Sequence, residues 1–110
     1  MPRGVLIAQS SPVSAELEEE YNRWYDEDHI PGILQVPGFL AARRYHVREA
    51  GHLQVPPGSF RYLTIYEIET DDVDAMLREL RARSADGRVP RSRTVAMQPP
   101  PTLTFYELRG

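Results

Sequence analysis

The residues best suited to chemistry lie between positions 21 and 39, in the stretch YNRWYDEDHIPGILQVPGF. This stretch combines four aromatic rings with an imidazole and contains two breaks rich in proline and glycine. Tyr25 precedes His29 by four residues, a spacing that puts two side chains on one face of a helix. An imidazole beside a phenol can accept and return protons, so His29 and Tyr25 are the candidate catalytic residues.

A structural role for His29 is an equal alternative. We expect the helix to end at His29-Ile30-Pro31, because proline has no backbone N–H to continue the helical hydrogen bonds. A histidine at that position would cap the last carbonyls, where the helix macrodipole favours an imidazolium. In the functional alternative, Asp26 or Asp28 orients the ring, and the helix end lies over a sheet where a pocket can open.

Further side chains are candidates for substrate binding. Trp24 and Tyr21 fall on one face of the helix and fit either the core or the wall of a pocket. Arg43 and Arg44 are adjacent on an expected strand and point to opposite faces, so one of them can point inward. We assign Arg43 to a carboxylate or enolate of the substrate, with the choice between the two arginines left open. Tyr66 is a candidate proton donor to an oxyanion.

Composition removes several kinds of chemistry. The chain has no cysteine, and all 13 of its basic residues are arginine. Thiolate nucleophiles, thiolate ligation of metal or haem, Schiff-base catalysis and a P-loop are therefore excluded. His46 and His52 share no short metal-ligand spacing with His29. Acid/base chemistry remains, and we expect no cofactor: no metal ion, haem or flavin.

Charge and hydropathy argue against nucleic acid and membrane partners. The formal net charge is −3, and the arginines are scattered rather than gathered on one face. The apolar run after Gly4 ends at Gln9, too short for a secretory segment or a membrane span. We expect a cytoplasmic protein in which residues 1–110 form a single domain. The core of such a domain is small, so a partner subunit would help to stabilise it.

Hydropathy patterns predict six elements in the order β-α-β-β-α-β. The expected strands cover residues 4–9, 39–47, 60–69 and 102–108, and the expected helices cover 16–29 and 71–83. A loop rich in Gly and Pro separates the middle strands, and the prolines at 99–101 fit an edge strand. This order is typical of an α+β, ferredoxin-like fold, a four-stranded antiparallel sheet with both helices on one face. Since the third strand carries bulk on both faces, we expect a homodimer that covers the open face.

The chain resembles the dimeric α/β-barrel superfamily, and most closely its EthD-like branch. The resemblance rests on Trp24-Tyr25, on His29 four residues later, on Pro31 and on Val36-Pro37-Gly38-Phe39. Relatives include cofactor-free monooxygenases, polyketide cyclases, lactone isomerases, aldoxime dehydratases and haem-dependent enzymes. The resemblance implies that His29 and Trp24 line a pocket at the end of the first helix. The helix at 71–83 contains no histidine, which departs from the haem-dependent relatives.

Two functions therefore stay open. One is a cofactor-independent enzyme of the cyclase, isomerase, dehydratase or monooxygenase type, acting on an aromatic or polyketide-like compound of secondary metabolism. In it, His29 is the base, and tyrosine or arginine groups stabilise an oxyanion. The other is a non-catalytic, dimeric binding or accessory protein that uses the same pocket for a small molecule.

Overall fold

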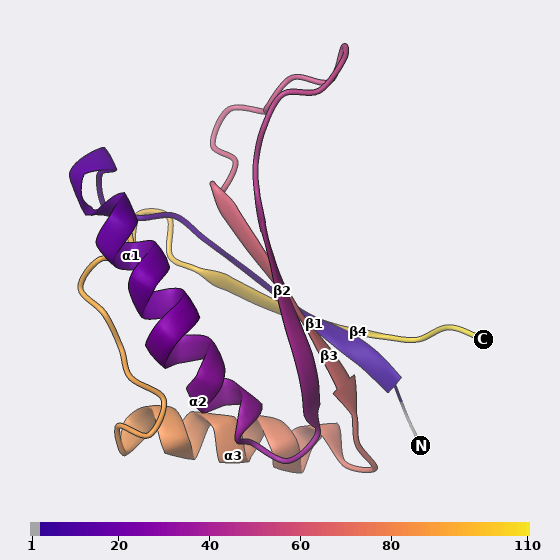
Figure 1. Ribbon diagram of the computed structural model, residues 1–110. Helices are drawn as coiled ribbons and strands as arrows, with labels where there is room; N and C mark the ends of the chain where they lie inside the picture. Colours follow the sequence, from indigo (N-terminus) through magenta and orange to yellow (C-terminus); the bar gives the residue numbers. More distant parts are fainter. Residues whose placement is uncertain (1–2) are drawn as a thin grey trace.

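The computed structural model describes residues 3–110 as a four-stranded sheet with helices packed on one face (Figure 1). The strands are antiparallel and lie in the order β2-β3-β1-β4. This arrangement confirms the ferredoxin-like βαββαβ order and places β4 at an edge, as its entrance prolines predict. In chain order the elements are β1 (Arg3–Ser10), a 3₁₀ turn (Ala15–Leu17), α1 (Glu18–Trp24), a π-helical turn (Tyr25–His29), α2 (Ile30–Leu34), β2 (Phe39–His46), β3 (Tyr62–Glu69), α3 (Val73–Ala85) and β4 (Thr102–Glu107).

Alternation along the central strands separates the two faces of the sheet. In β1, Leu6 and Ala8 are buried, and they pair with Tyr66 and Thr64 of β3, which are buried as well. Residues directly opposite each other on antiparallel strands point to the same face, so these four side chains form one layer. Met76 of α3 packs on that layer. The core therefore lies between the sheet and the helices.

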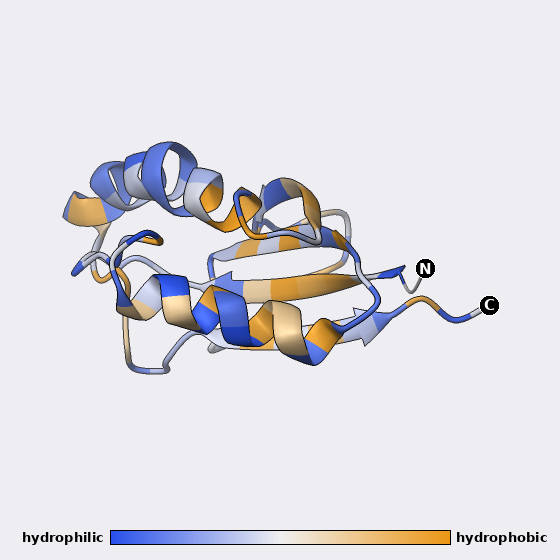
Figure 2. Cartoon of the chain, turned by 90° about the horizontal axis from the view of Figure 1, so that it is seen from below, coloured by the Kyte–Doolittle hydropathy of each residue, from blue (hydrophilic) through white to orange (hydrophobic). Residues whose placement is uncertain are grey.

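The helices bury different kinds of residue against this layer. α3 carries apolar residues at a helical period, and its N-cap Asp72 accepts a hydrogen bond of 2.9 Å from the backbone N–H of Ala75. Apolar and polar residues accordingly alternate around α3 in Figure 2. α1 is polar almost throughout, and its buried residue is Tyr21. The contact between α1 and the sheet is therefore made by aromatic rings rather than aliphatic side chains.

The first helix does not end at Pro31, contrary to the expectation from the sequence. Residues Tyr25–His29 form one turn of π-helix, and α2 continues the helix beyond it. The backbone N–H of Ile30 donates to the carbonyl of Tyr25, five residues earlier. This wider turn ends at His29, just ahead of Ile30 and Pro31 at the start of α2, so the missing N–H of the proline is accommodated without a break. The chain turns instead at Gly38, whose φ of 106° favours glycine.

A bulge in β2 decides which of its side chains face the helices. Between Phe39 and Ala41 the pairing with β3 shifts by one residue, which leaves Leu40 as the extra residue. Uninterrupted alternation would put Phe39 and Arg43 on one face. The bulge moves the alternation by one position, so Arg44 faces the helices and Arg43 faces away.

The opposite face of the sheet carries partly exposed apolar and aromatic side chains. Within residues 3–110 no helix covers this face (Figure 1). Tyr45 and Tyr106 lie on it and are 50% and 57% exposed. Two wide, shallow hollows of about 420 and 490 Å³ occupy its two ends. This face is the one that the expected homodimer would cover.

Candidate active site

An apolar cavity of about 280 Å³ lies between the first helix and the sheet. Its walls come from β1, the first helix, β3, α3 and the segment that leads into β4. Aliphatic side chains such as Leu6, Ile33 and Val89 form much of the surface. The cavity brings together four of the six residues assigned to the site from the sequence, namely Trp24, Tyr25, His29 and Tyr66.

The π-helical turn places two aromatic rings against the imidazole. The ring of Trp24 stacks on that of His29, with centroids 4.5 Å apart and an angle of 28° between the planes. Tyr25 meets the same imidazole edge-on at 5.0 Å. In an α-helix, residues four apart share a face but residues five apart do not. Because the π-turn is wider, His29 contacts both the residue four positions before it and the residue five positions before it.

The imidazole of His29 is held neutral. The indole Nε1 of Trp24 donates a hydrogen bond of 3.2 Å to the carbonyl of Pro90, and that carbonyl also meets the His29 ring. Nδ1 of His29 is buried and has no hydrogen-bond partner. Burial, with a smaller contribution from the charge of Arg44, lowers the pKa of His29 to about 4, against the opposing effect of the Pro90 carbonyl. Near neutral pH the ring is therefore uncharged, with one nitrogen that donates and one that accepts.

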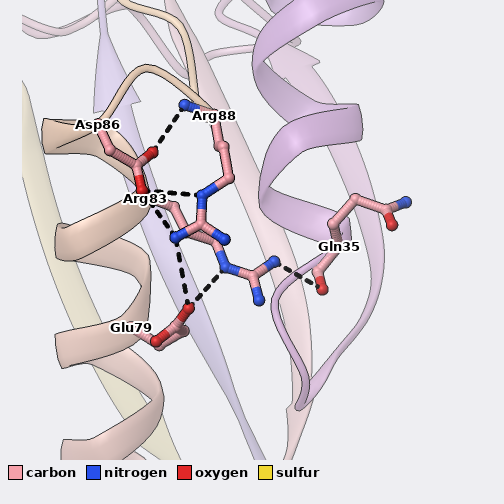
Figure 3. A network of polar contacts seen from close by, with 5 residues as sticks. All are labelled: Gln35, Glu79, Arg83, Asp86 and Arg88. Carbon is pink, nitrogen blue, oxygen red and sulfur yellow. Dashed lines mark hydrogen bonds and ion pairs between the residues drawn. The ribbon is translucent and has the colours of Figure 1, made fainter.

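A polar network holds the segment that supplies the Pro90 carbonyl (Figure 3). Arg83 of α3 pairs with Glu79 at 2.7 Å and donates to the carbonyl of Gln35 at 3.1 Å, so it ties α3 to the end of α2. Just beyond α3, Arg88 pairs with Asp86 at 2.7 Å. These ion pairs are largely exposed and add little stability singly. Their effect is to fix the course of the chain from α3 to the imidazole.

Close packing fixes the same segment from the side of α2. The backbone N–H of Val89 donates to the carbonyl of Arg83 at 3.0 Å, and the Val89 side chain is buried. Gly32 lies so close to this segment that a Cβ there would stand 2.9 Å from the carbonyl oxygen of Arg88. Any larger residue at Gly32 would push the segment away from the helix, and with it the Pro90 carbonyl.

Tyr66 supplies a second unpartnered polar atom to the cavity. Its side chain is 1% exposed and packs edge-on against Phe39 at 5.8 Å, yet its hydroxyl has no partner with hydrogen-bond geometry. Burial raises the pKa of Tyr66 strongly, and the nearby Tyr25 adds to the shift. The phenol therefore stays protonated and can donate a hydrogen bond.

Tyr21 lies behind the cavity rather than on its wall. It is completely buried, and its hydroxyl shares a hydrogen bond with the buried hydroxyl of Ser10. Its ring contacts Tyr25 at 5.4 Å and Tyr62 at 5.3 Å. Burial raises the pKa of Tyr21 to about 12. Of the two roles open to Tyr21 from the sequence, its surroundings match the core role.

Arg43 lies on the open face, away from the cavity, and forms an ion pair of 3.1 Å with Glu67. The inward arginine is Arg44, which the bulge in β2 turns toward the helices. Its guanidinium lies 4.4 Å from the ring centre of Tyr25 and hydrogen-bonds Asn22 and Asp26. Arg44 is not on the cavity wall, and its charge acts on His29 from behind Tyr25. The assignment of Arg43 to a ligand in this cavity is corrected accordingly.

Two contributors to the site carry no recognisable pattern in the sequence. The Pro90 carbonyl is a backbone atom, so no residue type signals its role. The segment from 89 to 103 also supplies wall residues, among them Val95 and Leu103. The visible signal for this segment is its few apolar residues, Val89 and the run Val95-Ala96-Met97, since apolar residues in a connecting segment indicate burial.

The gathered titratable residues are aromatic rather than acidic. Within residues 3–110, no group of three or more His, Asp or Glu side chains lies close enough together to hold a metal ion. The groups that do converge are His29, Tyr25 and Tyr66, around the cavity.

No helix within residues 3–110 has the length and apolar character needed to span a membrane.

Two solved structures share this fold. One is the "putative monooxygenase" of Shewanella loihica PV-4, with a TM-score of 0.61 and 15% identity over 100% of this chain and 98% of that one. The other is an EthD family protein of Bacillus halodurans C-125, with a TM-score of 0.58 and 14% identity over 99% of this chain and 100% of that one. No protein-family model and no curated protein matches the sequence. The chain therefore has the EthD-like, ferredoxin-like fold, which confirms the resemblance at the level of the fold.

Proposed function

We propose that this chain is a cofactor-independent enzyme that does acid/base chemistry on an aromatic or polyketide-like molecule in the cavity. The observation that carries the proposal is the uncharged imidazole of His29, which lines an apolar cavity together with Tyr25 and Tyr66. A titratable side chain with a strongly shifted pKa in such a cavity is typical of a functional site. The fold shared with a protein named as a putative monooxygenase supports a small-molecule enzyme.

The proposed chemistry assigns a role to each cavity residue. His29 accepts a proton from the substrate at the nitrogen of its ring that carries no proton. The hydroxyls of Tyr66 and Tyr25 donate hydrogen bonds to the oxyanion that then forms. Trp24 stacks on the imidazole and fixes its plane. Cyclisation, isomerisation, dehydration and oxygenation through a carbanion all begin with this proton transfer.

His29→Gln should lower kcat by about 10²- to 10⁴-fold, because glutamine forms hydrogen bonds but does not transfer protons at this pH. Turnover is followed by mass spectrometry on a panel of enolisable aromatic ketones, hydroxynaphthoquinones and aryl lactones. Affinity, measured by calorimetry, should change by less than about threefold, since the cavity walls are unchanged. His52→Gln, in an exposed loop, is the matched control and should keep full activity. Full activity of His29→Gln would eliminate His29 as the base.

A non-catalytic binding protein is the second candidate, and the low pKa of His29 favours it. A ring with a pKa of about 4 is a weak base, whereas a hydrogen-bond acceptor in a binding site needs no basicity. In that case wild type should bind panel compounds without converting any of them. Removal of the imidazole should then lower affinity and leave no turnover to lose.

We also propose that the chain is a homodimer through the open face of the sheet. Light scattering after gel filtration at micromolar concentration should give twice the chain mass of 12.6 kDa. Tyr106→Arg places a charge on that face, on the edge strand β4, and should shift the protein toward monomer, because an unpaired buried charge is unfavourable. Leu53→Arg, in the exposed β2–β3 loop, is the control and should leave the mass unchanged. A wild-type mass of a single chain would contradict the proposed dimer.

A further inference from the structure

The cavity of the candidate active site is closed toward the first helix and toward the sheet. On the helix side, the Trp24 indole donates to the Pro90 carbonyl, and Gly32 packs directly against the backbone of Arg88 and Val89. On the sheet side, buried side chains of β1 and β3 form the floor. An opening to solvent therefore has to lie on another part of the wall.

The wall is exposed to solvent where the chain enters β4. Among the described residues around the cavity, the largely exposed ones are consecutive, namely Pro101, Thr102 and Leu103. Leu103 is 64% exposed although its side chain is apolar. It lies opposite the buried Ala8 of β1, so its side chain points to the helix side of the sheet. Leu103 therefore stands at the mouth of the cavity and not on the open face.

Helix α3 supplies the other side of this opening. Leu80 and Ser84 line the same cavity as Leu103, and their spacing of four residues places them on one face of the helix. Both residues are partly exposed, whereas Met76, one turn earlier, is buried. The helix thus covers the sheet closely at Met76 and less closely toward its C-terminal end. The opening lies between this end of α3 and the start of β4.

The wall of the cavity carries no charge near neutral pH. None of the described residues around it is Arg, Asp or Glu, although such residues make up 26% of the chain. The imidazole of His29 is uncharged as well, because burial lowers its pKa to about 4. A charged ligand would lose its hydration in this cavity and meet no opposite charge, which is unfavourable. The cavity therefore favours an uncharged ligand.

The volume of the cavity limits the ligand to a small ring system. A dry apolar cavity of about 150 Å³ holds a benzene ring. This cavity has about 280 Å³, so it has room for a compound of about two fused rings. A third ring would have to extend through the opening, past Leu103. The side chain at this position consequently decides how much of a larger compound the site accommodates.

We propose that Leu103 is a specificity-determining residue of this site and limits its ligands to uncharged compounds of about two fused rings. The inference rests on the proposed function, because it names the substrate class of the same cavity. Leu103 contacts the outer end of a bound ligand and takes no part in proton transfer. Its replacement should change which compounds bind and leave the chemistry at His29 unchanged.

The single tryptophan gives a direct measurement of binding. Trp24 lines the cavity, and its indole N–H gives one resonance in a nitrogen–proton correlation spectrum of ¹⁵N-labelled protein. Titration of that resonance gives an affinity for each probe. The neutral probes are benzyl alcohol, 1-naphthalenemethanol and 9-anthracenemethanol, which carry the same polar group on one ring and on two and three fused rings. The charged probe is 1-naphthoate.

We expect wild type to bind 1-naphthalenemethanol about tenfold or more tightly than 9-anthracenemethanol, which is too large, and 1-naphthoate, which is charged. Leu103→Ala widens the opening and should bring the affinity for 9-anthracenemethanol within about threefold of that for 1-naphthalenemethanol. Leu103→Phe narrows it and should weaken binding of 1-naphthalenemethanol by about fivefold or more. Binding of benzyl alcohol to this variant should change by less than about twofold, because one ring does not reach the opening.

The matched controls are Leu53→Ala and Leu53→Phe. Leu53 is 63% exposed, nearly the same as Leu103, but it lies in the β2–β3 loop and does not line the cavity. Both control variants should keep the preferences of wild type. Because Leu103 is largely exposed, its replacement should leave the fold intact, and the remaining resonances of each variant check this.

Tightest wild-type binding of 9-anthracenemethanol or 1-naphthoate would overturn the inference, as would an unchanged size preference in both Leu103 variants or no shift with any neutral probe. Failure of the enzymatic proposal is separable from these outcomes. A size preference set by Leu103, without turnover of any compound, supports the inference and leaves a binding protein. Conversely, His29-dependent turnover with the same range of substrate sizes in wild type and Leu103→Ala would overturn the inference and keep the enzyme.

Discussion

Lowering the pH from 7 to 4 should reduce the free energy of unfolding by up to about 3 kcal/mol through His29 alone. In the folded chain, burial lowers the pKa of this imidazole to about 4. In the unfolded chain the same group has a pKa near 6.5, its ordinary value. Over the interval between these values the unfolded state binds a proton that the folded state does not.

The direction of the effect follows from this difference in proton binding. Above about pH 6.5 the ring is neutral in both states, so its burial carries no electrostatic penalty. As the pH falls toward 4, protonation increasingly favours the unfolded chain. Below pH 4 the folded ring is protonated as well, and the loss reaches its limit. Between pH 6.5 and pH 4, the free energy of unfolding should fall by about 1.4 kcal/mol for each pH unit.

Urea unfolding at fixed protein concentration between pH 4 and pH 8 measures this loss, with His29→Phe as the matched variant. Phenylalanine keeps an aromatic ring beside Trp24 and cannot be protonated, so the variant should lack the part of the slope that belongs to His29. All other ionisable groups are the same in the two proteins, so their effect cancels in the comparison. Identical pH dependence in the two proteins would mean that the imidazole is solvated in the folded state.

The order of elements could be predicted because each element satisfies a local rule. Val73, Met76, Leu77 and Leu80 recur at the period of a helix, and Met76 is buried as that period requires. The bulk on both faces of β3 predicted that both faces of the sheet are covered; the helices cover one of them, and the homodimer that would cover the other stays a prediction. These patterns depend on the backbone period alone. For that reason the fold was confirmed although the chain shares only 14–15% identity with the two solved structures.

Features that depend on one extra residue could not be predicted in this way. The π-turn before Pro31 and the bulge at Leu40 each insert a residue into a regular period. The first brings Trp24 onto His29, and the second exchanges Arg43 for Arg44 on the inner face. The positions of both extra residues are set by tertiary packing, because the repeating pattern of a helix or strand does not show where an extra residue will be inserted. The Tyr25–His29 pair needed only a spacing of four and was visible in the sequence.

A backbone carbonyl that comes from a distant part of the chain could not be predicted from the sequence, for a different reason. Pro90 receives the indole N–H of Trp24 across 66 positions of the chain. Any residue type has a carbonyl, so the position of that acceptor is fixed only when α3 and the following segment have packed. The position of the Trp24 ring against His29 is thus fixed in part by a contact that sequence patterns do not encode.

Replacement of Tyr21 by alanine should reduce the free energy of unfolding by about 3–5 kcal/mol, a large part of the stability of a small domain. The ring lies completely buried among Trp24, Tyr25 and Tyr62, and its removal leaves a cavity under α1. Tyr21→Phe keeps the ring but leaves the buried hydroxyl of Ser10 without its partner. The expected loss for that variant is about 1–2 kcal/mol.

Tyr66→Phe is the matched comparison, since it removes a buried tyrosine hydroxyl that has no partner. Nothing is left unpaired by this change, so stability measured by urea unfolding at pH 7 should stay the same or rise by about 1 kcal/mol. The opposite pattern, a stable Tyr21→Phe and a destabilised Tyr66→Phe, would mean that Tyr66 bonds within the folded chain and Tyr21 does not. With the expected pattern, the ring and the hydroxyl of Tyr21 both stabilise the packing of the first helix on the sheet, whereas the hydroxyl of Tyr66 adds nothing to the stability of the folded chain.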